Sequence, residues 1–243
     1  MRALTNLLMV VAAILVVGGA VYVVMNNHAP EDAGNTIASR TPAAPRSPPD
    51  APRPAPTKHP KPTVVAFVGD DWTAGTGASS HARRFTTLVS KRLGFTERNL
   101  GADGTGYAQT SSDAGDFASR VKDVAAAHPD IVVVSGGRND NTNSLDTVSS
   151  RTHALFDDLH EQLPHATLVA ITPWWGDSDT PTQVTAIGQA VKQAVTSVGG
   201  SYLDIPDPIH HHPGFMADAA DPDDDGYAAI AAAIEPKLKR LLD

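Results

Sequence analysis

The chain has 243 residues, a net charge of −8 and no cysteine, which excludes disulfides, cysteine-ligated metals and a thiol nucleophile. The charge is uneven: residues 1–62 hold six basic and three acidic side chains, whereas residues 63–243 hold thirteen and twenty-four. A domain this acidic is unsuited to nucleic acid, because phosphate recognition requires clustered cations.

The N-terminal segment, residues 1–25, predicts a transmembrane signal anchor. Arg2 precedes an uncharged, apolar run over residues 7–25. Nineteen helical residues extend roughly 28 Å, enough to cross a hydrocarbon core. The positive-inside rule then places the rest of the chain outside the cytoplasm. A cleaved signal peptide ending near residues 18–20 is the alternative, and it exports the remainder as well.

Residues 26–62 predict a linker between the membrane segment and a folded domain. Nine prolines lie between Arg40 and Pro62. Such a segment has no apolar face to bury and favours an extended polyproline II conformation. Its basic side chains are typical of a solvated spacer.

Residues 63–243 predict one α/β domain, because short β-branched runs alternate with amphipathic stretches. This alternation indicates βαβ units and a doubly wound, mainly parallel five-stranded sheet with helices on both faces. The expected strands are Thr63–Val68, Phe95–Leu100, Ile131–Ser135, Thr167–Thr172 and Ser201–Ile205. The expected helices cover residues 80–93, 114–127, 142–163, 181–198 and 224–242. Ligands of such sheets bind at the carboxyl ends of the strands.

Four motifs lie at or beyond these strand ends. They are Gly69-Asp70-Asp71-Trp72, Gly101-Ala102-Asp103-Gly104, Gly136-Gly137-Arg138-Asn139-Asp140 and a late segment running from Asp218 to Tyr227. In order and spacing, this pattern resembles the SGNH (GDSL-type) hydrolases over the whole of residues 63–243. The resemblance implies a flavodoxin-like three-layer sandwich and a hydrolytic site assembled from the four motifs.

The resemblance also assigns roles, residue by residue. Gly104 and Asn139 match the family's oxyanion-binding positions, and Asp218 matches the acid that orients the catalytic histidine. The nucleophile position holds Asp71 in place of serine, and the base position holds Asp221 in place of histidine. A carboxylate is a poor nucleophile toward an ester and carries no hydroxyl proton, so we expect no serine-esterase chemistry through Asp71.

Two carboxylates at these positions favour a different reaction. Carboxyl pairs with separated pKa values carry out glycoside hydrolysis, one as acid and the other as nucleophile or base. We therefore expect a hydrolase acting on a cell-envelope polysaccharide or glycoconjugate, without a cofactor or metal. Side chains expected to line the pocket or stack on sugar are Asp140, Trp72, Trp174 and Trp175.

Two alternatives stay open. In the first, the domain is a pseudo-enzyme that binds a glycan or an envelope protein. In the second, it is a carbohydrate acyl-esterase with His210 as base, because Asp207-Pro208-Ile209-His210 also has the pattern Asp-x-x-His.

The segment Asp221 to Gly226 copies the first half of a calcium loop. Position 232 is alanine where the loop requires glutamate, so no metal site is predicted there.

Overall fold

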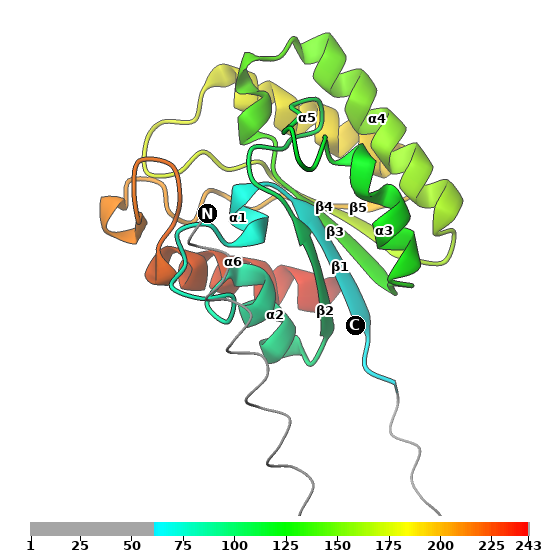
Figure 1. Cartoon of the computed structure of the whole chain (residues 1–243), viewed down its shortest axis with the longest axis horizontal. Helices are drawn as coiled ribbons and strands as arrows, with labels where there is room; N and C mark the ends of the chain where they lie inside the picture. The colour runs from blue at the N-terminus through cyan, green and yellow to red at the C-terminus, as the bar shows by residue number, and fades with distance from the viewer. Residues whose placement is uncertain (1–60, 243) are drawn as a thin grey trace, which may run out of the picture. The chain divides into compact units, whose positions relative to one another are not determined.

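The computed structural model describes residues 61–242 (Figure 1). The predicted anchor lies outside these residues, as does the linker up to residue 60. No helix within residues 61–242 is both long and apolar enough to cross a bilayer. Five parallel strands form one sheet in the order β2-β1-β3-β4-β5. The strands are β1 (Val64–Gly69), β2 (Thr96–Gly101), β3 (Ile131–Ser135), β4 (Thr167–Ile171) and β5 (Ser201–Leu203).

Helices cover both faces of the sheet, as the predicted three-layer sandwich requires (Figure 1). Helices α2 and α6 pack together on one face, and α3, α4 and α5 form the other layer. The α-helices are α1 (Asp71–Ala74), α2 (Phe85–Leu93), α3 (Val121–Ala126), α4 (Leu145–Gln162), α5 (Thr182–Ser197) and α6 (Asp224–Leu242). Between residues 61 and 242 the chain also forms the short 3₁₀ segments η1 (Ala118–Arg120), η2 (Arg138–Thr142) and η3 (Pro213–Phe215).

The alternation of side chains along the central strands explains why the core has two halves. Val65 and Phe67 of β1 join the cluster beneath α2 and α6, whereas Ala66 and Val68 face the opposite cluster beneath α3, α4 and α5. All four side chains are buried. A parallel strand covered on both faces reads as a continuous apolar run, which is the pattern that made β1 recognisable.

The site lies where the order of the strands in the sheet reverses. β1 pairs with β2 on one side and with β3 on the other, so the chain runs to opposite sides of β1 after this strand and after β2. In doubly wound sheets the crevice forms at this point, beyond the carboxyl ends of the strands. The helix α1 lies directly against these ends, since a Cβ at Gly101 would come within 2.2 Å of the Ala74 nitrogen.

Two of the predicted helices begin four or more residues later than expected. The helix expected over residues 80–93 starts at Phe85. The one expected over residues 114–127 becomes η1 and α3, because Ser111 and Gly115 exchange backbone hydrogen bonds and the Asp116 side chain bonds Ser119. Local side-chain bonding of this kind competes with helix formation.

Candidate active site

The turn after β1 presents Asp71 at the carboxyl edge of the sheet. Asp70 caps α1, because its Oδ1 accepts the Trp72 backbone N–H at 3.2 Å. Gly75 ends this four-residue helix with a φ of 94°, a left-handed conformation that favours glycine. Asp71 is the first residue of the helix and is half-buried.

The carboxyl group of Asp71 lies between the two residues to which the family resemblance assigns oxyanion binding. The Gly104 backbone N–H donates to its Oδ1 at 3.2 Å, and Asn139 Nδ2 donates to its Oδ2 at 2.8 Å. Gly104 has a φ of 67°, and Asn139 Nδ2 also donates to the Thr105 carbonyl at 3.0 Å. The structure thus brings Asp71, Gly104 and Asn139 together, with the Asp71 carboxyl group between the two donors.

Asp221 supplies a second carboxyl group in a drier environment. Its side chain is 11% exposed, and Arg138 Nη1 lies 3.8 Å from its Oδ1. Burial, followed by the negative charge of Asp71, raises the pKa of Asp221 to about 6, while Arg138 acts in the opposite direction. The environments of the two carboxyl groups are therefore different.

Asp218 shapes the turn that carries Asp221. Its Oδ1 accepts the backbone N–H groups of Ala220 at 2.7 Å and Asp221 at 2.8 Å. These bonds lower the pKa of the exposed Asp218 carboxyl. The structure places Asp218 at the site as a backbone support for Asp221.

Arg138 is a site residue to which the sequence analysis gave no role. Its guanidinium lies 5.1 Å from the ring centroid of Trp72 and 6.0 Å from that of Trp175, within cation–π range. It also donates to the Ala220 carbonyl, which accepts the Trp72 indole N–H at 3.0 Å. In the sequence, its position between two glycines and Asn139 could have indicated a role at the site. Its contact with Asp221 could not be predicted, because that contact depends on tertiary structure.

Asp70 is a second residue that sequence reasoning left without a role beyond its motif. Its carboxyl group is 2% exposed at the base of the site. Burial and the neighbouring Asp71 raise the pKa of Asp70 to about 7, opposed by Arg138 and by the hydrogen bond from Trp72. A Cβ at Gly136 would lie 2.9 Å from Asp70 Oδ2, so a glycine there leaves room for this carboxyl.

The expectation that Trp72 and Trp174 stack on sugar is wrong. Their side chains are only 3% and 4% exposed, and their rings stack on each other at 6.4 Å with an interplanar angle of 27°. Trp174 also donates its indole N–H to the Ile205 carbonyl at 3.0 Å. Their large apolar area is used in the core. Trp175 is half-buried and retains accessible surface beside Arg138.

Asp140, expected as a pocket residue, faces the interior instead. Its carboxylate is fully buried and accepts the backbone N–H groups of Tyr107, Ala108 and Gln109, each at 2.8 Å. It therefore fixes the loop that follows Gly104. Asp140 positions this loop and does not line the pocket.

The structure does not bring Asp207 and His210 together as an acid–base pair. Asp207 Oδ2 accepts the backbone N–H groups of Trp175 and Gly176, and its Oδ1 accepts that of Ile209. The imidazole of His210 instead bonds the Ser178 carbonyl at 3.1 Å. The sequence pattern Asp-x-x-His is present here without its geometry.

The fold and the arrangement of strand-end motifs define an SGNH-type hydrolase domain. The chain belongs to the GDSL-like lipase/acylhydrolase family, whose model matches residues 67–229. It is 27% identical over 197 residues to a GDSL lipase of Mycobacterium tuberculosis, covering 73% of this chain and 82% of that protein.

Solved structures share the fold at low sequence identity. A family two carbohydrate esterase from Clostridium thermocellum, in complex with cellohexaose, superposes with a TM-score of 0.63 at 16% identity, covering 75% of this chain and 66% of that one. Est24, a carbohydrate acetylesterase from Sinorhizobium meliloti, gives 0.61 at 14% identity, covering 74% and 99%. At sequence identities this low, the structural similarity shows a shared fold and no more.

Proposed function

We propose that the chain is a membrane-anchored, extracytoplasmic hydrolase of cell-envelope carbohydrate that uses Asp71 and Asp221 in place of a serine–histidine pair. One observation carries the proposal: two neighbouring carboxyl groups are held in different environments. Both Asp71 carboxyl oxygens accept hydrogen bonds, from Gly104 and Asn139, whereas Asp221 is shielded and its pKa is raised to about 6. Two carboxyl groups in different environments are what acid-assisted glycoside hydrolysis requires.

Each group has a defined part in the proposed reaction. Asp221 donates its proton to the departing glycosidic oxygen as the bond to the anomeric carbon breaks. Asp71 either attacks that carbon or takes a proton from the water that does. Arg138, 3.8 Å from Asp221, stabilises the carboxylate left after proton transfer. The anomeric configuration of the product distinguishes the two roles of Asp71.

The contacts of Asp71 argue against ester cleavage by the usual route of the family. An acyl transfer needs free donors where negative charge develops on the carbonyl oxygen. Here the Gly104 N–H and Asn139 Nδ2 already bond the Asp71 carboxylate. The carbohydrate substrate is proposed by analogy with the carbohydrate esterases that share the fold.

A second candidate is carbohydrate binding without turnover, which the same contacts also support. Both Asp71 oxygens accept hydrogen bonds, and this lowers the nucleophilicity of the carboxylate. In such a pseudo-enzyme, Asp71 would keep the loops of the site in place. The pocket would then recognise a glycan without breaking it.

The test measures release of new reducing ends from purified envelope polysaccharides by the full-length protein. Asp71→Asn and Asp221→Asn are each expected to lower the rate by about 10²-fold or more, because each removes one half of the acid–base pair. Asp123→Asn, on the exposed first turn of α3, is the matched control and should retain full activity. Full activity in Asp71→Asn would overturn the carboxylate mechanism. Saturable binding without release would select the second candidate.

A further inference from the structure

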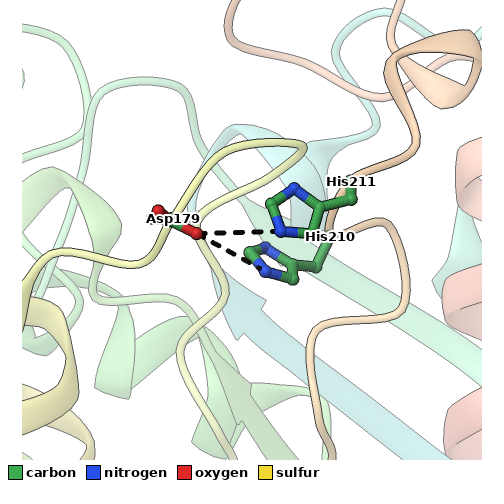
Figure 2. A group of neighbouring side chains, drawn as sticks. All are labelled: Asp179, His210 and His211. Atoms are coloured by element: carbon green, nitrogen blue, oxygen red, sulfur yellow. Dashed lines mark ion pairs between the residues drawn. The ribbon is translucent and has the colours of Figure 1, made fainter.

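A second cluster of chemically active side chains lies outside the carboxylate pair. It consists of Asp179, from the segment after β4, and His210 and His211, from the segment after β5 (Figure 2). We propose that this cluster is a binding site for a divalent transition-metal ion of the zinc class. The proposal does not depend on the reaction proposed above.

The spacing of the three side chains fits a single small ion. Nε2 of His210 and Nε2 of His211 each lie 3.8 Å from Asp179 Oδ1, and one ligand atom from each residue lies within 4.8 Å of the others. Ligands about 2.0–2.2 Å from a tetrahedral zinc ion are separated by about 3.4 Å. A contraction of about 0.4 Å in each of the two histidine–aspartate distances would therefore bring these pairs to the spacing of zinc ligands.

The hydrogen bond of His210 prepares its ring as a ligand. Its Nδ1 lies 3.1 Å from the Ser178 carbonyl, which can only accept, so Nδ1 carries the proton. The lone pair of a neutral ring is then on Nε2, directed at Asp179 (Figure 2). A backbone carbonyl holding the far nitrogen is the usual support of a metal-bound histidine. A zinc ion between Nε2 and the Asp179 carboxylate would take the place of the proton that joins this pair when the ring is charged.

The backbone is held in a costly conformation that brings the two histidines together. His211 has a φ of 58°, which is uncommon for a residue with a side chain. Its N–H donates to the Asp177 carbonyl at 2.9 Å, and the two imidazole centroids lie 3.8 Å apart. Adjacent histidines thus face the same carboxylate from one side.

The donor set selects the class of metal. Two imidazoles and one carboxylate suit zinc and its neighbours in the transition series, whereas calcium and magnesium prefer oxygen ligands. The side chains of Asp179 and His211 are 93% and 69% exposed, so the ion can exchange with solvent. A pocket of about 450 Å³ beside Asp179 and His210 leaves room for water at an open coordination position.

The test is calorimetric titration of the purified full-length protein with zinc chloride, alongside magnesium chloride. One zinc ion is expected to bind per chain at this site, and magnesium is not. Each of the variants Asp179→Asn, His210→Ala and His211→Ala removes a ligand and should weaken zinc binding at least tenfold. Loss of a residue that only hydrogen-bonds a metal ligand already lowers metal affinity by about 10-fold or more. His212→Ala is the matched control and should leave affinity unchanged, because the His212 ring packs on Phe215 at 5.1 Å.

Three results would overturn the proposal. The first is no zinc binding by the wild-type protein. The second is wild-type affinity in His210→Ala or His211→Ala. The third is an equal loss in His211→Ala and His212→Ala, which would show a histidine-rich loop without a built site. Far-UV circular dichroism of each variant confirms that the domain is folded.

Discussion

At the scale of single residues, the pKa of Asp221 depends on opposing neighbours. Burial and Asp71 raise this pKa, and Arg138 lowers it. If Asp221 is the general acid, kcat/KM falls about tenfold per pH unit above about pH 6, as the carboxyl loses its proton.

Arg138→Gln removes the cation and should move this alkaline limb to higher pH, because the Asp221 carboxylate is then less stabilised. The measurement is kcat/KM against pH for the variant and for Arg151→Gln, whose side chain is 61% exposed in the wild type and which should keep the wild-type profile. If the alkaline limb of kcat/KM in Arg138→Gln lies at the wild-type pH, Asp221 is not the general acid.

Asp70 gives a stability prediction with the opposite sign from most aspartates. Its pKa is raised to about 7 in the folded protein, above the unfolded value of 3.8. The folded state therefore binds more protons between about pH 4 and pH 7, and the Asp70 contribution to stability is lost as pH rises through this window.

Asp70→Asn keeps a helix-capping side chain but cannot ionise, so this variant should lose most of that pH dependence. Urea denaturation at pH 4, 5.5 and 7 measures the difference. Parallel stability curves for the wild type and Asp70→Asn would contradict the raised pKa.

The sequence predicted those site residues whose positions depend on the strand ends, and missed the properties that depend on tertiary contacts. Asp71, Gly104 and Asn139 lie directly beyond strand ends, so motif order was enough to place them together. The pKa of Asp70 and the contacts of Arg138 arise from burial and from segments distant in the chain. Trp72 and Trp174 also lie beyond strand ends and were therefore assigned to the pocket. Sequence position does not tell which way a side chain faces, so their burial was not predicted.

At the scale of elements, the strands were predicted better than the segments between them. β3 was predicted over its observed bounds, because each of its five residues is buried and apolar or small. The helix α1 and the 3₁₀ segment η2 were not predicted, since four or five residues carry no periodicity. These two short elements nevertheless hold Asp71 and Asn139.

The short element η2 also supports the loop after β2, through Asp140. Asp140→Asn replaces one carboxylate oxygen with a donor facing three backbone N–H groups, so at least one buried N–H loses its acceptor. The expected cost is about 1–3 kcal/mol of unfolding free energy. Urea denaturation measures it, with the exposed Asp146→Asn on α4 as control. A variant as stable as the wild type would contradict this role.

At the scale of the whole molecule, the absence of cysteine makes the proposed location directly testable. Ser112→Cys creates a single thiol at an exposed position of the domain. Intact cells expressing this variant should react with a membrane-impermeant maleimide if the apolar N-terminal run acts as the proposed anchor and exports the domain. The unsubstituted chain is the control for background labelling. Labelling only after lysis would place the domain in the cytoplasm.

The remaining question for the whole fold is whether only two side chains separate this chain from an ordinary member of its family. The sheet and the strand-end loops have the fold of the family, and Gly104 and Asn139 hold the positions that the resemblance assigns to oxyanion binding. The Asp71 carboxylate occupies those donors, and Asp221 stands where the resemblance expects histidine. Asp71→Ser would free both donors and add a hydroxyl nucleophile, and Asp221→His would add a base beside Asp218.

The double variant is therefore expected to hydrolyse p-nitrophenyl acetate at least about 10²-fold faster than either single variant. The gain should be strongly non-additive, because a serine without its base, or a base without its serine, contributes little. The comparison uses initial rates of the wild type, both single variants and the double variant, together with labelling by a serine-reactive phosphonate. A folded double variant that neither turns over the ester nor labels would show that Asp71 and Asp221 do not stand at the family's nucleophile and base positions, and the carboxylate mechanism would lose its structural basis.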